Sequence, residues 1–206
     1  MFFFPCILRE AFLPVPTAAD LLANMTLTDK LTIQGLTFEP FITQEQIAVL
    51  VHKIARQISA EYNGKTPHFI IVLKGAVFFA TDLLREISIP CSISFVRLRS
   101  YQGTSSTGKV EELLPLDTDI TDKDVIVIED LIDTGVTMHY FKQQLAAMQP
   151  RSIAIASLLF KPTQLLFEDA KPDYYGQEIP KEFIIGYGMD LDGLARNLPQ
   201  IYKLCK

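Results

Sequence analysis

Three apolar runs rich in β-branched residues constrain the fold of this chain more than any other feature. They are HFIIVL (68–73), VIVIE (125–129) and SIAIASLLF (152–160). The central run has no polar alternation, which is typical of a strand buried on both faces of a parallel sheet. Segments with helical features separate the runs, and this alternation predicts an α/β fold with a parallel-sheet core flanked by helices.

Local signals define the other expected elements. Thr43 and Gln46 have the spacing of a capping box, and the helix that they begin should end before Gly64. Residues 101–124 are polar and lack any period, so a long loop is expected there. The residues after about 160, rich in Pro, Gly and aromatics, are expected to form an irregular lobe. The remaining predicted elements are helices over 76–87 and from about Val136 to Met148, and a strand over 92–99.

Length, charge and cysteine usage limit the class of protein. A chain of 206 residues fits one α/β domain with a small lobe attached. The formal charge of -5 argues against a nucleic-acid-binding protein, which normally carries a basic patch. Cys6, Cys91 and Cys205 have no metal-ligand spacing, which predicts reduced thiols in a cytoplasmic protein. No apolar stretch reaches the roughly 18 residues of a membrane span.

The first 24 residues differ from the rest of the chain. They begin with MFFFPCILREAFLPVP, which is apolar but lacks the positive region of a signal peptide. Met25 opens MTLTDKLTIQGLTF, which is typical of the start of a globular domain. We therefore expect one domain over 25–206, preceded by an extension over 1–24 that is disordered or an artefact of the assigned start site.

A glycine-rich motif in the polar segment invites a second interpretation. Gly103, Gly108 and Lys109 spell G-x-x-x-x-G-K, one residue short of a Walker A loop. The next residue is Val110, which has no hydroxyl for Mg²⁺, and a helix starting there would soon meet Pro115. We therefore reject a nucleoside-triphosphatase and expect a lid or binding loop at this place.

The strongest chemical signal is VIVIEDLIDTGVTM (125–138). A buried run ends in Glu129 and Asp130, and Asp133 precedes a Thr-Gly turn that opens a helix. Ligands of open α/β sheets bind beyond the carboxyl ends of the strands. The free N–H groups of a helix start, with Gly135 permitting close approach, would form a phosphate cradle. Carboxylates beside a phosphate need another task, such as binding Mg²⁺ or sugar hydroxyls. The alternative is that the acids only cap the helix.

This motif resembles the phosphoribosyl-diphosphate-binding motif of the type I phosphoribosyltransferases. Further segments occur in the same order in hypoxanthine-guanine phosphoribosyltransferases, above all the bacterial ones. They are VLKGAVFF (72–79), FVRLRSYQGTSSTGKV (95–110), SLLFKP (157–162) and PDYYGQEIPKEFIIGYGMDLDGLARNLPQIY (172–202). The resemblance covers about residues 31–204. It implies the type I phosphoribosyltransferase fold, with a core over about 43–160 and a small hood lobe from about 25–42 and 161–206.

The resemblance also implies an activity and roles for the acidic motif. The enzyme would transfer the 5-phosphoribosyl group of phosphoribosyl diphosphate to N9 of hypoxanthine, and of guanine, giving IMP or GMP. Glu129 and Asp130 match the acidic pair that holds the ribose hydroxyls, directly or through Mg²⁺. Asp133 matches the proposed general base or acid at N7 of the purine. The residues that match the 5′-phosphate loop are Thr134, Gly135, Val136, where some members have Lys or Arg, and Thr137.

Other matching residues concern the pyrophosphate and the closing loop. Lys74 and Gly75 match the pyrophosphate loop, which has a non-proline cis peptide in this family. Without the resemblance, the residues around Lys74 suggest only a solvated lysine between a strand and a helix. Arg196 matches a second pyrophosphate contact. Ser100 and Tyr101 match the start of a catalytic loop that closes over the site and excludes water.

The last matching residues concern metal and base. Asp190 matches a ligand of the Mg²⁺ on the pyrophosphate. Lys161 matches the residue that donates to the purine 6-oxygen, and because an ammonium has only donors, it favours 6-oxopurines over adenine. Phe183 matches the ring that stacks on the base, and the backbone of Ile184 matches a contact to the purine edge. On sequence alone, Phe183 would be assigned to the core.

Two alternatives stay open at this point. Some proteins of this fold are regulators that bind RNA or DNA and sense a nucleotide, although the acidic charge and the single domain argue against this. The sequence does not define the preference at purine position 2, so a xanthine-preferring homologue is the second alternative. The resemblance further implies a homodimer or homotetramer that acts on small molecules and binds neither nucleic acid nor membranes.

Overall fold

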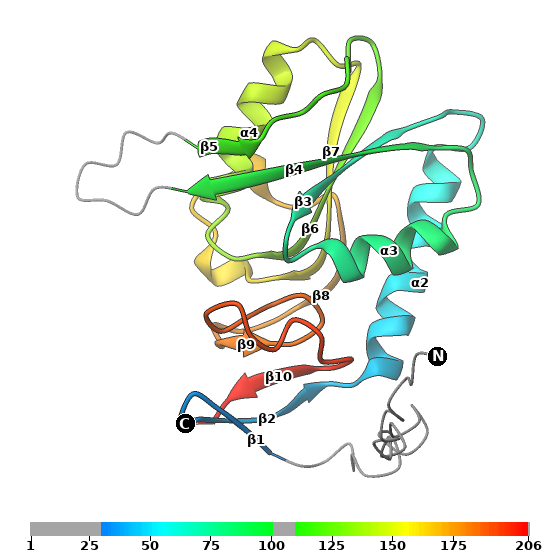
Figure 1. Cartoon of the computed structure of the whole chain (residues 1–206). Helices are drawn as coiled ribbons and strands as arrows, with labels where there is room; N and C mark the ends of the chain where they lie inside the picture. The colour runs from blue at the N-terminus through cyan, green and yellow to red at the C-terminus, as the bar shows by residue number, and fades with distance from the viewer. Residues whose placement is uncertain (1–29, 101–109, 206) are drawn as a thin grey trace, which may run out of the picture.

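The computed structural model describes residues 30–100 and 110–205, which form a large and a small β-sheet with helices (Figure 1). The extension predicted over 1–24 lies outside these residues, as do Tyr101 and Lys109. The large sheet, here called the core sheet, has the strand order β5-β4-β3-β6-β7-β8. Its strands are β3 (His68–Leu73), β4 (Ser92–Ser100), β5 (Val110–Leu114), β6 (Asp124–Ile132), β7 (Ser152–Phe160) and β8 (Tyr174–Glu178).

The predicted parallel α/β sheet is confirmed. Strands β4, β3, β6, β7 and β8 pair in parallel, each with its neighbour. The edge strand β5 pairs with β4 in antiparallel fashion, although a loop was expected for its residues. An edge strand of five residues gives too short a pattern to stand out from a polar segment. Because a strand begins at Val110, where a Walker motif requires a helix, the structure agrees with the rejection of that motif.

Helices cover both faces of the core sheet, and their caps explain their starts. The helix α2 (Gln44–Glu61) begins at the predicted capping box, in which Thr43 and Gln46 bond each other's backbone N–H. Together with α3 (Val77–Glu86) it packs on one face, whereas α4 (Val136–Ala147) packs on the other (Figure 1). Side chains of β3 therefore divide alternately between two apolar clusters, as expected of a strand buried on both faces.

The small sheet joins the two ends of the described chain. It has the order β1-β2-β10-β9 and lies below the core sheet in Figure 1. Its strands are β1 (Leu31–Ile33), β2 (Leu36–Ile42), β9 (Ile184–Ile185) and β10 (Ile201–Leu204). The C-terminal region is thus more regular than expected, and its strand β8 extends the core sheet beyond residue 161. The boundary predicted between core and hood near residue 160 stays a prediction.

The described part of the chain contains no helix that is both long and apolar enough to cross a membrane.

Candidate active site

Most of the predicted site residues lie at or just after the carboxyl ends of β3, β6 and β7, which are adjacent in the core sheet. Because α3 follows β3 on one face and α4 follows β6 on the other, a crevice is expected between these strands. A pocket of about 260 Å³ lies there, bounded by Leu73 of β3, Leu98 of β4 and the residues after Glu129. The predicted site residues that line it are Glu129, Asp133, Thr134, Gly135, Val136 and Thr137.

The loop after β6 has the backbone of an anion site. Gly135 has the left-handed φ of 76°, which reverses the chain so that α4 starts at Val136. No side chain caps the start of this helix. The first N–H groups of a helix have no intrahelical acceptors, and residues 134–138 line the pocket, so an anion bound there could accept from them. Val136 in place of a basic residue does not alter this backbone contribution.

Two adjacent carboxyl groups, Glu129 and Asp130, lie near the end of β6 and have raised pKa values. Asp130 is 8% exposed and accepts from the N–H of Leu131 at 2.9 Å. Burial raises the pKa of Asp130, although the charge of Arg196 acts against this. Burial also raises the pKa of Glu129 well above its usual range, and the neighbouring charge of Asp130 adds to the effect. The pair thus favours protons, and a bound cation would relieve the same repulsion.

The carboxylate oxygens of this pair suit Mg²⁺, which prefers hard oxygen ligands. The described residues contain no cluster of three or more His, Cys, Asp or Glu side chains that could hold a metal ion. Mg²⁺ commonly binds through one or two carboxylates together with substrate phosphates and water. The pair therefore fits a metal that arrives with an oxygen-rich substrate.

The raised pKa of Glu129 leads to a prediction for stability. A carboxyl whose pKa is higher in the folded protein than in the unfolded chain stabilises the fold at pH values below the unfolded-chain pKa. This contribution is lost as the pH rises through the folded-state pKa. We expect Glu129→Gln to raise the Tm of the ligand-free protein at pH 7 by roughly 2–4 °C, as about 1 kcal/mol does in a chain of this size. At pH 4 the two proteins should melt alike. Thermal melts from pH 4 to 8 test this, with the exposed Glu168→Gln as control. A shift that is equal at every pH would contradict it.

A buried ammonium joins the pocket from β7. Lys161 follows β7 directly and is only 5% exposed. Its Nζ donates to Oδ2 of Asp133 at 2.9 Å, and its backbone N–H donates to the carbonyl of Ile132 at 2.9 Å. The structure thus pairs the residue predicted to read the purine 6-oxygen with the residue predicted to exchange its N7 proton. This direct pairing was not predicted.

The loop after β3 packs closely against the acidic pair. A cis peptide joins Leu73 to Lys74, one bond before the Lys74-Gly75 pair. A Cβ at Gly75 would overlap the carboxylate of Asp130, and a Cβ at Gly188 would overlap the carbonyl of Gly75. Only glycine fits at both positions. Gly75 of the predicted pyrophosphate loop therefore lies between β6 and the loop that follows β9, whereas Lys74 is exposed.

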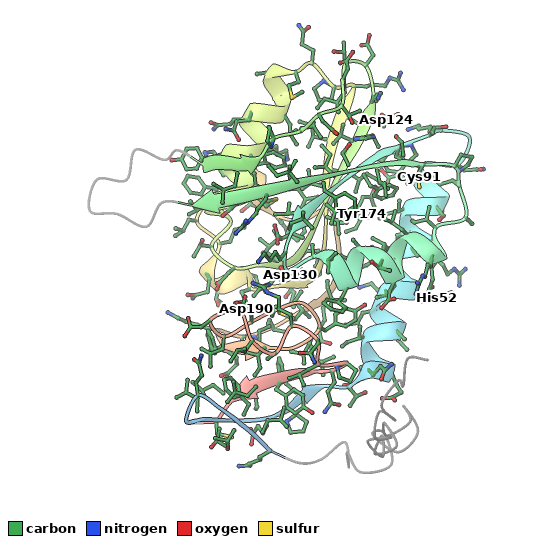
Figure 2. The ribbon with its side chains drawn as sticks, viewed as in Figure 1. His52, Cys91, Asp124, Asp130, Tyr174 and Asp190 are labelled. Atoms are coloured by element: carbon green, nitrogen blue, oxygen red, sulfur yellow. The ribbon has the colours of Figure 1, made fainter. Side chains whose placement is uncertain are left out.

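The loop after β9 contributes the predicted Arg196 and Asp190. Nη1 of Arg196 donates to the carbonyl of Gly188 at 2.6 Å, and its Nη2 lies 2.5 Å from Oδ1 of Asp190. The other oxygen of Asp190 accepts from the N–H of Gly193 at 2.6 Å. Figure 2 shows Asp130 at the end of the core sheet and Asp190 in the loop between the two sheets. The two residues predicted to bind pyrophosphate and its Mg²⁺ thus form a salt bridge with each other.

The other residues predicted to contact the base and to begin the closing loop lie apart from the carboxylates of β6 or outside the described residues. Phe183 is 46% exposed and its ring lies 6.2 Å from that of Phe38, whereas Ile184 is buried in β9. Within 30–100 and 110–205, no ring contact or side-chain hydrogen bond joins Phe183 or Ile184 to the carboxylates. Ser100 ends β4, and Tyr101 lies outside the described residues.

Two positions at this junction were missed by sequence reasoning. Gly188 lies within the matching segment 172–202 but had no predicted role, although a glycine in GYGMD is a signal for close backbone approach. The preceding Tyr187 donates from its hydroxyl to Oδ2 of Asp82 in α3 at 2.7 Å. This bond ties the loop after β9 to the helix that follows the predicted pyrophosphate loop. No local sequence signal reveals a bond between residues so far apart in the chain.

Comparisons with known proteins agree with this geometry. The family model described as "Phosphoribosyl transferase domain" matches residues 42–192. A hypoxanthine-guanine phosphoribosyltransferase of Staphylococcus aureus is 37% identical over 167 residues, which are 81% of this chain and 93% of that protein. One of Mycobacterium bovis is 38% identical over 170 residues, or 79% of this chain and 84% of that protein.

A solved structure is similar to this chain in both sequence and fold. The hypoxanthine-guanine phosphoribosyltransferase of Bacillus anthracis, with a HEPES molecule in its active site, is 39% identical and has a TM-score of 0.77. The match covers 81% of this chain and 98% of that one. The strand order, the loop at the start of α4 and these relatives lead to one conclusion. The chain belongs to the phosphoribosyltransferase domain family and has the type I phosphoribosyltransferase fold.

Proposed function

We propose that this protein transfers the 5-phosphoribosyl group of phosphoribosyl diphosphate to N9 of hypoxanthine, and of guanine, giving IMP or GMP and pyrophosphate. One observation carries the proposal: the buried ammonium of Lys161 lies 2.9 Å from Asp133, directly before the anion loop of residues 134–137. A group with donors only, an acid and an anion cradle together suit a 6-oxopurine nucleotide. The names of the relatives support the same substrates.

The acidic residues have a defined task in such a transfer. As pyrophosphate leaves, C1 of the ribose acquires positive charge in an oxocarbenium-like transition state. Glu129 and Asp130 would accept from the ribose hydroxyls and oppose this charge, an effect that is larger in the transition state than in the ground state. Asp133 would exchange the N7 proton of the purine. Because β6 holds Glu129 and Asp130 in place, little reorganisation is needed.

The leaving group would be held from the opposite side. Lys74, the backbone of Gly75 and Arg196 would bind the pyrophosphate, with the salt bridge between Arg196 and Asp190 opening as phosphate oxygens replace the carboxylate. We propose Mg²⁺ as the cofactor: Glu129 and Asp130 would hold it on the side of the ribose hydroxyls, and Asp190 would be the protein ligand of the Mg²⁺ on the pyrophosphate. When bound, Mg²⁺ supplies positive charge that neutralises the pyrophosphate.

The base and the entrance complete the proposed site. The ring of Phe183 would stack on the purine; the residue is 46% exposed, so a face of the ring is accessible to a base. The backbone of Ile184 would contact the purine edge. Ser100 and Tyr101 would begin the loop that closes over the substrates; the nearby Leu98 already lines the pocket.

We also propose that the protein is a cytoplasmic homodimer or homotetramer. An apolar hollow of about 410 Å³ between α2, α3 and the segment 197–199 supports a contact between subunits. It is lined by Ile47, Val51 and the partly exposed Phe78. Light scattering at assay concentrations measures the mass in solution directly.

An ultraviolet assay tests the proposed activity. Purified protein is incubated with Mg²⁺, phosphoribosyl diphosphate and one base at a time: hypoxanthine, guanine, xanthine or adenine. We expect nucleotide from hypoxanthine and guanine, loss of activity with EDTA, and none with adenine. A rate with xanthine above that with hypoxanthine would reassign the base preference. No product from any base, with a folded protein that binds phosphoribosyl diphosphate, would favour a regulatory nucleotide sensor instead.

A further inference from the structure

The segment between β7 and β8 lies directly beneath the anion loop. We call Pro162–Ala170 the strap; it contains two short 3₁₀ turns, Pro162–Gln164 and Glu168–Ala170. A Cβ at Gly135 would come within 2.8 Å of Cδ1 of Leu165 and 2.9 Å of Cβ of Ala170. The strap therefore packs directly against the left-handed turn at Gly135 and leaves no room for a side chain there.

Hydrogen bonds attach the strap to the loop on both sides of Asp133. The N–H of Leu166 donates to the carbonyl of Thr134 at 3.0 Å. Directly before the strap, the N–H of Lys161 donates to the carbonyl of Ile132 at 2.9 Å, and its Nζ donates to Oδ2 of Asp133. The residue proposed to read the purine thus lies at one end of a segment that also supports the proposed 5′-phosphate loop.

One side chain of α4 holds the far end of the strap. The ring of His139 stacks on Phe167, with centroids 4.0 Å apart and planes inclined by 10°. Its Nδ1 lies 2.7 and 2.9 Å from the two carboxylate oxygens of Asp169. Lys142, further along the same helix, donates to the backbone carbonyl of Asp169 at 2.9 Å. The His139 side chain is 18% exposed and that of Asp169 is 47% exposed, so the ring is largely covered by its stacking on Phe167 whereas the bond to Asp169 borders the solvent.

His139 also belongs to the unit that starts the anion loop. Its backbone N–H donates to the carbonyl of Gly135 at 2.9 Å, which is the first turn of α4. One residue therefore connects the beginning of the helix, through its backbone, with the strap, through its ring.

We propose that His139 is a positioning residue that fixes the distance between Lys161 and the 5′-phosphate loop. The inference rests on the proposed function. A purine nucleotide carries its base and its 5′-phosphate at fixed separation. A site that holds its two binding groups at that same separation therefore binds the nucleotide more tightly. Stacking on Phe167 and bonding to Asp169 hold the strap against α4, so both binding sites move as one body.

Three variants separate the two contacts of His139. His139→Ala removes both the ring and the bond to Asp169. His139→Phe keeps a ring that can stack on Phe167, and His139→Asn keeps a donor at the position of Nδ1. The matched control is His52→Ala, because His52 forms the same kind of pair with Glu86, at 2.8 Å, on the exposed surface of α2 and α3.

We expect His139→Ala to raise the KM values for hypoxanthine and phosphoribosyl diphosphate, and the Kd for IMP, each about tenfold (about 1.4 kcal/mol), because the base site and the phosphate loop are no longer held at one separation. The kcat should change by less than about threefold, since the reacting groups stay in place. His139→Phe and His139→Asn should each recover part of the loss, and His52→Ala should match the wild type. Steady-state kinetics and calorimetry of IMP binding measure these values.

Other results would overturn the inference. If His139→Ala lowers the Tm but leaves all three constants unchanged, the residue serves the fold only. If Asn and Phe recover nothing while the protein stays folded, the ring and Nδ1 contacts do not position the strap. A wild-type protein that neither binds IMP nor converts hypoxanthine would refute the proposed function itself, which is a separate outcome.

Discussion

Replacing Asp133 by Asn should lower kcat with hypoxanthine by about 10²- to 10⁴-fold, the usual contribution of a positioned general acid or base. The Kd of phosphoribosyl diphosphate should change little. An amide cannot exchange the N7 proton of the purine, whereas its oxygen still accepts from Nζ of Lys161, which lies 2.9 Å from the native carboxylate. The side chain of Asp133 is 47% exposed but that of Lys161 is only 7% exposed, so the variant should also have a lower Tm, because the buried ammonium loses its counter-charge.

The measurement is single-turnover kinetics together with calorimetric binding of phosphoribosyl diphosphate. The control variant is Asp122→Asn, which makes the same chemical change at an exposed turn. There the backbone has a φ of 56°, which Asn tolerates as well as Asp. Equal losses of turnover and of donor binding in the Asp133 variant would assign the residue a structural role, and an unchanged kcat would remove it from proton transfer.

The core of the fold could be predicted from the sequence because buried parallel strands leave a local record. The runs at 68–73, 125–129 and 152–160 all became strands of one parallel sheet. The capping box at Thr43 and Gln46 likewise fixed the start of α2 within its own turn. In each case a few neighbouring residues contain the whole signal, so no knowledge of distant contacts is needed.

The elements that were missed depend on distant partners. The strand β9 has two residues, and it exists because β10, which in turn pairs with β2, lies beside it. The strand β5 forms only along the edge of β4. Such segments are too short to show a period of their own, and their backbone conformation is decided by tertiary pairing.

The candidate site divides along the same line. The acids at the end of β6 and the turn at Gly135 were predicted because they lie close together in the sequence, at the end of a buried strand. The pair formed by Lys161 and Asp133 was not, since it joins the ends of two strands. The close packing of Gly75 between Asp130 and Gly188 also joins three segments, and only the structure brings them together.

The second large effect is expected at Lys161. Its ammonium is 5% exposed, and in the proposed complex it donates to the purine 6-oxygen. Hydrogen bonds that involve a charged group contribute about 1.5–3 kcal/mol, so Lys161→Ala should reduce kcat/KM for hypoxanthine by roughly 10- to 150-fold. The Kd for phosphoribosyl diphosphate should stay close to the wild-type value, because the anion loop and the residues proposed for pyrophosphate are untouched.

A change of base selectivity distinguishes this role from a general one. Lys161→Gln presents an amide that can both donate and accept, so adenine, with its 6-amino group, should be rejected less strongly than by the wild type. Lys53→Ala is the matched control: this lysine donates to the carbonyls of Tyr175 and Gly176, far from the pocket. If the Gln variant loses activity with hypoxanthine and adenine in equal proportion, Lys161 does not read the 6-position. Its bond to Asp133 would then be its only task.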